Sequence, residues 1–253
     1  MDPNKISVVI VSYYRADQLR QSLSALIHPP AELQIIVVDN GSRDGSASLD
    51  DEFPNVRFSR LPRNFGLTRA LNIGIRAADR DYILLLHDDV IIESAAVTAL
   101  AEFLENCPDV GAVCPYLNVP QVRPLPTPSK PDPAFEIPAR ADEIVAECVS
   151  GAAIMVRAAF LRSMGHIDER YGNYGSAIEL CARVRSSNRR IIVLGNVSAS
   201  HGSSPSPTPK GALKRDRIAG TAAFIGKHHG FGAGLLYRLK TAPFGAAKID
   251  GSG

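Results

Sequence analysis

Short apolar runs alternate with amphipathic segments in the first ninety residues. The runs at 6–12, 33–38 and 82–86 are almost continuous in valine, isoleucine and leucine. Runs of this length are shorter than an average helix and are typical of strands buried on both faces. The segments at 17–27 and 67–77 instead repeat apolar residues at helical spacing. This order predicts an α/β fold, with a mostly parallel, doubly wound sheet and helices on both faces.

The second half of the chain continues this pattern after an interruption. Seven prolines fall between 117 and 140, and they predict a long extended loop without regular structure. An apolar segment at 145–156 follows, and helical spacing returns at about 176–187. We expect an α/β domain over 1–204 and a basic, helical extension over 205–253.

Composition narrows the possible partners. The formal net charge is only +2, so no strong overall field is expected and no nucleic-acid partner is predicted. The charge is uneven, because residues from Pro205 onward carry +6 and the preceding residues carry −4. A basic end suggests an anionic partner, either a membrane surface or a phosphate group, although a solvated basic face is the alternative.

Several features indicate the compartment. The four cysteines form no metal or redox spacing and fit buried thiols in a reducing cytoplasm. We recognise no signal peptide, and no apolar run approaches the length of a membrane span. We therefore expect a cytoplasmic protein, with possible contact to the inner face of the membrane through the basic end.

The apolar run at 82–86 stops abruptly at His87-Asp88-Asp89. Buried, unpaired acids are costly, so packing alone rarely explains two adjacent carboxylates at a strand end. Ligands of open α/β sheets bind at this end of the strands, and two acids there suit a divalent cation that holds phosphate oxygens. A solvated acidic turn is the other interpretation.

The second apolar run ends in a loop, 39–46, that is rich in aspartate, serine and glycine. Such side chains bond to nearby backbone groups, and glycine permits positive φ. The loop lacks the Gly-x-Gly-x-x-Gly spacing of a dinucleotide-binding turn, which argues against a nicotinamide site.

Several collinear stretches between Ile6 and Gly230 together resemble a known family. They are Val8-Val-Ile-Val-Ser-Tyr13, Val37-Val-Asp-Asn-Gly-Ser42, Asn64-Phe-Gly66 with Ala70 and Asn72, Leu84-Leu-Leu-His-Asp-Asp-Val90, 151–156, Gly165-His-Ile-Asp-Glu169, Glu179-Leu-Cys181 with Arg183, and His201. The chain resembles family 2 glycosyltransferases of the GT-A fold, in particular the rhamnosyltransferase-like branch that acts in cell-surface polysaccharide assembly. The resemblance implies transfer of a sugar from a nucleotide-diphosphate donor to an acceptor hydroxyl.

The resemblance also implies a metal site. The diphosphate leaving group develops negative charge that an electrophile must neutralise. Asp89 matches the last acid of the family's Asp-x-Asp motif and is expected to ligate Mg²⁺ or Mn²⁺. His87 replaces the first acid, which favours Mn²⁺. His201 matches a further histidine ligand, with a surface histidine as the alternative.

By the same resemblance, one set of residues is expected to hold the nucleotide sugar. Asp39 would accept a hydrogen bond from a ring N–H of the base, and Ser12 and Tyr13 would border that base. Asn64 and Gly66 match the part that approaches the diphosphate or ribose. The full set of expected donor-binding residues is Ser12, Tyr13, Asp39, Asn40, Asn64, Gly66, Asn72 and Asp88.

The chain departs from the family at the catalytic base. The family places a carboxylate there, which accepts the proton of the acceptor hydroxyl in inverting transfer. This chain has Ser176-Ala177 at that place, and alanine cannot accept a proton. Three explanations stay open: Glu179, Asp168 or Glu169 acts instead; catalysis has been lost; or the alanine was introduced deliberately.

We therefore predict a metal-assisted, inverting glycosyltransferase that uses a UDP- or dTDP-sugar, with rhamnose as a candidate sugar. The acceptor would be a glycan or a lipid-linked saccharide. The alternatives are a catalytically silent nucleotide-sugar-binding protein and, more weakly, a nucleotidyltransferase. The prediction requires Asp39 and Asp89 to lie on opposite sides of one cleft.

Overall fold

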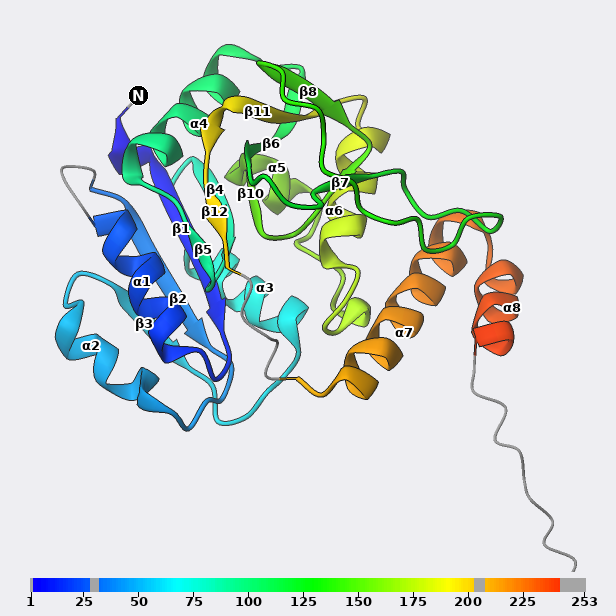
Figure 1. Cartoon of the computed structure of the whole chain (residues 1–253), viewed down its shortest axis with the longest axis horizontal. Helices are drawn as coiled ribbons and strands as arrows, with labels where there is room; N and C mark the ends of the chain where they lie inside the picture. Colours follow the sequence, from blue (N-terminus) through cyan, green and yellow to red (C-terminus); the bar gives the residue numbers. More distant parts are fainter. Residues whose placement is uncertain (1, 28–31, 203–207, 242–253) are drawn as a thin grey trace, which may run out of the picture.

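A large mixed sheet forms the centre of the computed structural model, which describes residues 2–27, 32–202 and 208–241 (Figure 1). Within these residues the sheet has the strand order β3-β2-β1-β4-β10-β6-β11-β8. The strands are β1 (Ile6–Ser12), β2 (Gln34–Asp39), β3 (Arg57–Arg60), β4 (Tyr82–His87), β6 (Val110–Tyr116), β8 (Glu143–Ala146), β10 (Ala153–Arg157) and β11 (Arg190–Ser198).

Most neighbouring strands of this sheet are parallel. β3, β2, β1 and β4 run in one direction, and β6 and β11 form a second parallel pair. β10 lies antiparallel between β4 and β6, and β8 lies antiparallel at the edge beside β11. The predicted α/β fold with a mostly parallel sheet is confirmed.

Helices cover both faces of the sheet, as the sequence predicts (Figure 1). On one face α1 (Ala16–Ile27) and α4 (Ser94–Asn106) share a core with the apolar side chains of the sheet. On the other face the core includes α3 (Leu67–Ala77), α5 (Ala158–Ser163) and α6 (Ser176–Ser186). The short α2 (Leu49–Glu52) follows β2. Strands buried on both faces explain why the apolar runs lack alternation.

Two short ribbons complete the body. β5 (Val90–Ile91) pairs with β12 (Ser200–His201), and β7 (Val122–Arg123) pairs with β9 (Cys148–Val149). The prediction of an entirely irregular 117–140 segment is therefore wrong at β7, because neither Val122 nor Arg123 is a proline and both can pair. Most of the remaining segment has no regular structure.

A helical hairpin follows the body. α7 (Lys210–His229) and α8 (Phe231–Thr241) pack on each other at one end of the molecule (Figure 1). Phe224 of α7 is 2% exposed and belongs to the same core as α3 and α6. The predicted boundary at 204/205 lies outside the described residues. Within the described residues, no helix combines the length and apolarity that a membrane crossing needs.

Candidate functional site

The carboxyl ends of three parallel strands meet at one edge of the sheet. β1 ends at Ser12, which is in register with Asp39 at the end of β2. On its other side, β1 pairs Val11 with His87 at the end of β4. The chain therefore brings three separate predicted segments together, as expected for a parallel sheet whose ligand lies beyond the strand ends.

An open cleft of about 470 Å³ lies at this edge. Its walls come from the ends of the strands, from the start of α3 and from the loop before α6. Thr208, just before α7, and Leu213, within α7, complete the walls. It is lined by Val11, Tyr13, Arg15, Asn40, Asn64, Leu67, His87, Asp88, Asp89, Asn173, His201, Gly202, Thr208 and Leu213.

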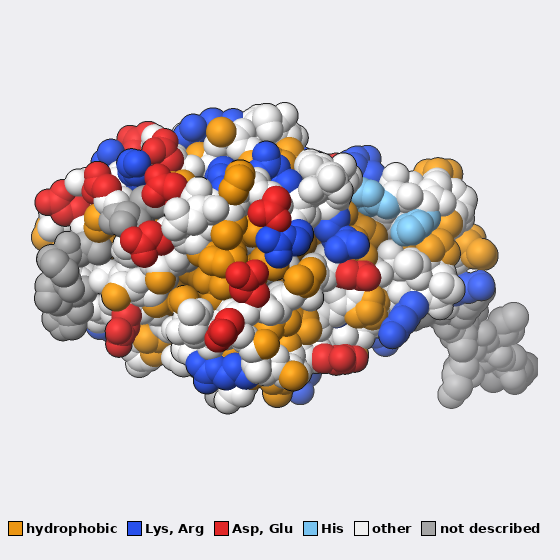
Figure 2. Space-filling model, turned by 90° about the horizontal axis from the view of Figure 1, so that it is seen from above, with side chains coloured by type: hydrophobic (Ala, Val, Ile, Leu, Met, Phe, Trp, Pro, Cys, Tyr) orange, Lys and Arg blue, Asp and Glu red, His pale blue; other side chains and the backbone are white. Residues whose placement is uncertain are grey.

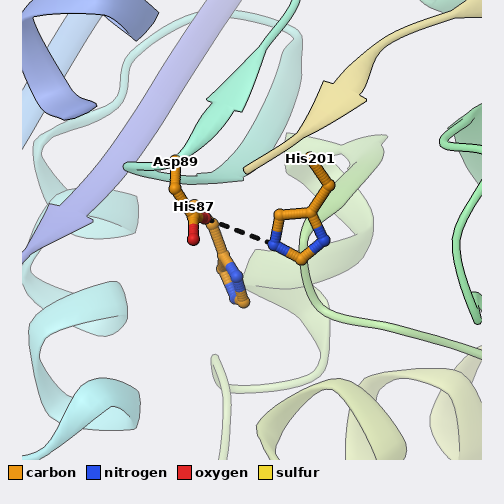
Figure 3. Close-up of side chains that lie close together, drawn as sticks. All are labelled: His87, Asp89 and His201. Atoms are coloured by element: carbon orange, nitrogen blue, oxygen red, sulfur yellow. Dashed lines mark ion pairs between the residues drawn. The ribbon is translucent and has the colours of Figure 1, made fainter. Parts of the chain in front are cut away.

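Three side chains in the cleft form a potential metal-binding group. One ligand atom each from His87, Asp89 and His201 lies within 4.8 Å of the others (Figure 3). The β5–β12 ribbon positions His201, because Val90 pairs directly with it. The N–H of Gly202 donates to the backbone oxygen of Asp89 at 2.7 Å, and a Cβ at Gly202 would lie only 3.0 Å from that oxygen.

The charges around Asp89 keep it ionised. Burial acts to raise the pKa of Asp89, but the contacts that His201 and Arg15 make with its carboxylate outweigh burial and lower this pKa to about 2. Arg15 contacts Oδ2 of Asp89 directly and lies 3.6 Å from Oδ1 of Asp88. Burial raises the pKa of Asp88 to about 6. Burial also lowers the pKa of His87 to about 4, which leaves its ring neutral near pH 7.

The atoms present fit a divalent cation. Oδ1 of Asp89 is buried and has no hydrogen-bond partner among the described residues, although Nε2 of His201 lies 3.2 Å away. A cation would supply the missing partner to this oxygen. One carboxylate and two imidazole rings suit Mn²⁺ better than Mg²⁺, which prefers oxygen ligands. The predicted set of His87, Asp89 and His201 is thus assembled in one place.

Part of the predicted donor-binding set also lines the cleft. Tyr13, Asn40, Asn64 and Asp88 are among its lining residues. Asn40 is buried and bridges two segments, because its Nδ2 donates to Oδ1 of Asn64 at 3.1 Å while its Oδ1 accepts from the N–H of Phe65 at 2.9 Å. These bonds fix the turn that leads into α3.

The remaining predicted donor residues lie outside the cleft lining. Ser12 is buried at the end of β1. Gly66, with φ +90°, forms the start of α3. Asn72 is buried and holds the backbone of Ile167 through two hydrogen bonds of 2.7 and 3.0 Å. Asn72 therefore anchors a loop, and its contacts argue against a direct role in donor binding.

Asp39 lies at the expected sheet edge but turns toward its own loop. Its carboxylate accepts from the N–H of Ser42 at 2.9 Å and from the hydroxyl of Ser46 at 3.3 Å. It is 5% exposed and is not among the residues that line the cleft with Asp89. The expectation that the two aspartates face each other across one cleft is therefore not met, and base binding by Asp39 stays a prediction.

Ala177 lines an apolar cavity of about 190 Å³ that adjoins the cleft. The two spaces share Val11, Leu67, His87 and Asn173. A Cβ on Gly151 would lie 3.2 Å from Cβ of Ala177 and 3.6 Å from Nε2 of His87, so position 177 faces the metal-binding group. No carboxylate lines this cavity among the described residues.

The three acids considered as substitutes for the base lie elsewhere. Glu179 has no exposed side-chain surface and is bonded to groups of α6, α7 and the η3 turn (Glu169–Tyr171). Asp168 bonds Arg170 and Lys227, at 2.6 and 3.1 Å. Glu169 bonds Arg69 at 3.2 Å. The contacts of all three argue against the role of general base.

Sequence reasoning missed several residues of the cleft, and two of them, Arg15 and Asn173, make contacts that join its walls. Arg15 follows the Tyr13-Tyr14 pair beyond β1, and its link to Asp89 is visible only once β1 and β4 are paired. Asn173 accepts from the N–H of Leu67 at 2.9 Å, so it joins the loop before α6 to the start of α3. A polar residue in a glycine-flanked loop, Gly172-Asn173-Tyr174-Gly175, was the available signal.

Comparison with known proteins decides the family. The family model described as "Glycosyl transferase family 2" matches residues 7–164. The chain belongs to glycosyl transferase family 2. The match includes His87 and Asp89 and ends before α6. Part of the lining of the apolar cavity, and all of the β12 strand with His201, lie beyond the matched residues.

Curated relatives and solved structures agree with this family. Poly-beta-1,6-N-acetyl-D-glucosamine synthase of Staphylococcus epidermidis is 31% identical over 114 residues, which are 43% of this chain and 27% of the relative. The chain thus corresponds to only about a quarter of that protein. The structure of GalNAc-T7 with UDP, GalNAc and Mn²⁺ is similar with a TM-score of 0.66 and 15% identity, over 85% of this chain and 47% of that one.

A third similar protein is a mannosyltransferase of known structure. The mannosyltransferase PcManGT from Pyrobaculum calidifontis, in complex with GDP-Man and Mn²⁺, has a TM-score of 0.60 and 18% identity, over 94% of this chain and 75% of that one. These structural likenesses confirm the GT-A fold of this family 2 member. The comparisons do not specify the rhamnosyltransferase-like branch, which stays a prediction.

Proposed function

We propose that this family 2 chain transfers a sugar from a UDP- or dTDP-sugar to an acceptor hydroxyl in cell-surface polysaccharide synthesis, with Mn²⁺ or Mg²⁺ as cofactor. The observation that carries the proposal is the group of His87, Asp89 and His201 at the edge of the sheet, inside an open cleft. Similar structures that contain Mn²⁺ with UDP or GDP-Man support it.

The donor would lie along the ends of β1, β2 and β4. Its base would lie toward Tyr13, which lines the cleft, and its diphosphate toward His87, Asp89 and His201. A cation held there would neutralise the charge that develops on the leaving diphosphate. Arg15, already in contact with Asp89, would add a second positive charge to the same end of the donor.

Binding of the nucleotide tests this arrangement. We expect UDP or dTDP to bind in a calorimetric titration, more tightly with Mn²⁺ than without it, and we expect Asp89→Asn to remove the effect of the metal. Asp109→Asn, which changes an exposed carboxylate paired with Arg190, is the matched control. Absence of nucleotide binding under every condition would contradict the proposal.

A silent nucleotide-sugar-binding protein is the second candidate, because the apolar cavity presents Ala177 and no described carboxylate. Donor hydrolysis and transfer by the unmodified protein and by Ala177→Asp separate the two candidates. A general base contributes roughly a hundredfold to ten-thousandfold. Turnover by Ala177→Asp that exceeds the background rate of the unmodified protein by this factor would favour the silent binder.

We further propose that the acceptor is reached at a membrane surface through α8. Phe231, Leu235, Leu236 and Leu239 are 79%, 46%, 53% and 57% exposed. At about 100° per residue they cover an arc of about 140° on the helix. Gly234 lies outside this arc and is buried against α7, where a Cβ would be 2.7 Å from Gly226. The apolar arc therefore faces away from the protein.

The charges beside the apolar arc favour a membrane surface over a second copy of the chain as its partner. Arg238 and Lys240 flank the apolar arc of α8, and Figure 2 shows hydrophobic side chains gathered at the end of the molecule where α8 lies. Anionic lipids attract such cations, by roughly 1 kcal/mol each. A symmetric dimer through the same arc would bring like charges together. An apolar helix face flanked by cations is the pattern of an interfacial helix.

Flotation with vesicles that contain anionic lipid tests this surface. Each exposed leucine that enters the bilayer is worth about 1.5 kcal/mol or more. Leu236→Asp with Leu239→Asp should therefore lower the partition coefficient by about a hundredfold. Val145→Asp, at an equally exposed apolar residue of β8, should leave it unchanged. Equal binding by the two variants would contradict the role of α8.

A further inference from the structure

A charged pocket lies beside the cleft that contains Asp89 and the apolar cavity that contains Ala177. Lys210, Lys214 and Arg217 recur at positions i, i+4 and i+7 of α7, so they share one face of that helix. This face meets the loop before α6. The basic pocket, as we call it, is lined by Asn173, Tyr174, Lys210, Leu213, Lys214, Asp216 and Arg217.

The basic pocket carries an excess of positive charge. Its one acidic lining residue, Asp216, accepts a hydrogen bond from Nδ2 of Asn173 at 3.0 Å. Arg217 lies 3.3 Å from Asp132, which also pairs with Arg123. Among the described residues, no carboxylate lies within 4 Å of the ammonium group of Lys210 or Lys214. Two cations of the pocket therefore have no described carboxylate within ion-pair distance, although Asp216 lines the same pocket.

The position of the basic pocket separates it from the metal-binding group. It shares Leu213 and Asn173 with the cleft, and Asn173 and Tyr174 with the apolar cavity that contains Ala177. None of its three cations is among the residues that line the cleft around Asp89. The cations thus border the side on which an acceptor would approach, beyond the place of the donor diphosphate.

We propose that the basic pocket binds a phosphate group of the acceptor, next to the sugar that receives the new linkage. This inference rests on the proposed function, because it assumes that the donor occupies the cleft. Lysine ammonium groups are strong phosphate ligands, and two that have no described carboxylate within ion-pair distance are available here. A saccharide joined to a lipid through phosphate has this chemistry, and α8 lies on the same helical hairpin as the pocket.

A titration with a sugar phosphate tests the pocket. The protein is first saturated with UDP and Mn²⁺, and glucose 1-phosphate or neutral glucose is then added. We expect glucose 1-phosphate to bind and glucose not to bind. Lys210→Ala with Lys214→Ala should weaken binding of glucose 1-phosphate about tenfold or more, and should change the affinity for UDP less than twofold. Arg215→Ala, an exposed cation of α7 outside the pocket, is the matched control and should change neither.

Four results would overturn the inference. The first is failure of the unmodified protein to bind glucose 1-phosphate. The second is binding by the double variant that equals that of the unmodified protein. The third is an equal loss in Arg215→Ala, which would show an effect of net charge alone. The fourth is a parallel loss of UDP affinity in the double variant, which would assign the cations to the donor diphosphate. Failure of the unmodified protein to bind UDP, measured in the first step, would instead contradict the proposed function.

Discussion

Replacing Glu179 by glutamine separates a structural carboxylate from a catalytic one. Oε1 of Glu179 accepts from Nε of Arg183 and from Nζ of Lys227, each at 2.6 Å. Oε2 accepts from the hydroxyl of Tyr171 at 2.7 Å and lies 2.9 Å from Nε2 of His228. Glutamine would remove the charge and direct an NH₂ group at these donors. Both cations would then lack their buried partner.

The size of the effect follows from the pKa. Burial acts to raise the pKa of Glu179, but bonds from His228, Lys227, Tyr171 and Arg183 outweigh it and lower this pKa from 4.5 to about 2. This difference corresponds to about 3 kcal/mol of stability in the ionised state. Because the folded-state pKa is the lower one, the contribution is complete above about pH 4.5 and is lost as the pH falls toward 2.

At neutral pH we expect Glu179→Gln to lower the free energy of unfolding by about 3 kcal/mol, which agrees with the 3–5 kcal/mol typical of a broken buried ion pair. For a chain of this size that lowers Tm by about 6–12 °C in scanning calorimetry. The difference between the unmodified protein and the variant should shrink below pH 4. Glu169→Gln, at a half-exposed carboxylate, should shift Tm by no more than about 2 °C.

The opposite result would refute this reasoning. If Glu179 were the general base, Glu179→Gln would reduce donor turnover by roughly a hundredfold or more and leave Tm nearly unchanged. Turnover should therefore be measured at about 20 °C, on protein whose folded fraction is known from calorimetry. A stable but inactive variant would restore Glu179 as a catalytic candidate.

Three further perturbations test the site and its supports. Asp89→Asn should weaken Mn²⁺ binding at least tenfold in electron paramagnetic resonance titration, because it removes the only carboxylate of the metal-binding group; unchanged binding would place the ion elsewhere. Gly41→Ala should lower both Tm and UDP affinity, because Gly41 has φ +87° and a Cβ would lie 2.5 Å from Cα of Arg63. An unchanged affinity for UDP would show that the turn at Gly41 does not affect nucleotide binding in the cleft. Gly220→Ala should lower Tm by several degrees, because its Cβ would lie 2.2 Å from the backbone oxygen of Tyr174. An unchanged Tm in calorimetry would mean that α7 can move away from Tyr174 at no cost in stability.

Local patterns were sufficient for the first half of the fold. The predicted helix over 67–77 coincides with α3, and the predicted strand over 6–12 coincides with β1. The apolar segment at 145–156 was harder, because it contains the end of β8, all of β9 and most of β10. Periodicity records which residues are apolar, but it does not record where a chain leaves one strand and enters another. The antiparallel placement of β10 between β4 and β6 therefore required the structure.

For the site, too, local patterns predicted some residues, and the contacts of others required the structure. The acids after β4 could be predicted from sequence as a cation site because parallel strands present their carboxyl ends at one edge. The expected roles of His87 and Asp89 as ligands came from the resemblance to the family. The surroundings of Glu179 could not be predicted from sequence, because Lys227 and His228 lie about fifty positions later in the chain and become neighbours only when α7 docks. The position of Asp39 at a strand end was predicted, but the direction of its side chain was not. Its bonds to Ser42 and Ser46 depend on the fold of one loop.

α6 joins the two halves of the proposed acceptor side. One face of this helix presents Ala177 to the apolar cavity, and another holds Glu179 against α7. The buried bonds of Glu179 therefore fix α7, and with it Lys210 and Lys214, relative to the wall that contains Ala177. Restoring an acid at Ala177 and removing cations from α7 should consequently alter one acceptor-binding surface from two sides. If the proposal holds, the two changes should show coupled effects on transfer and independent effects on UDP binding.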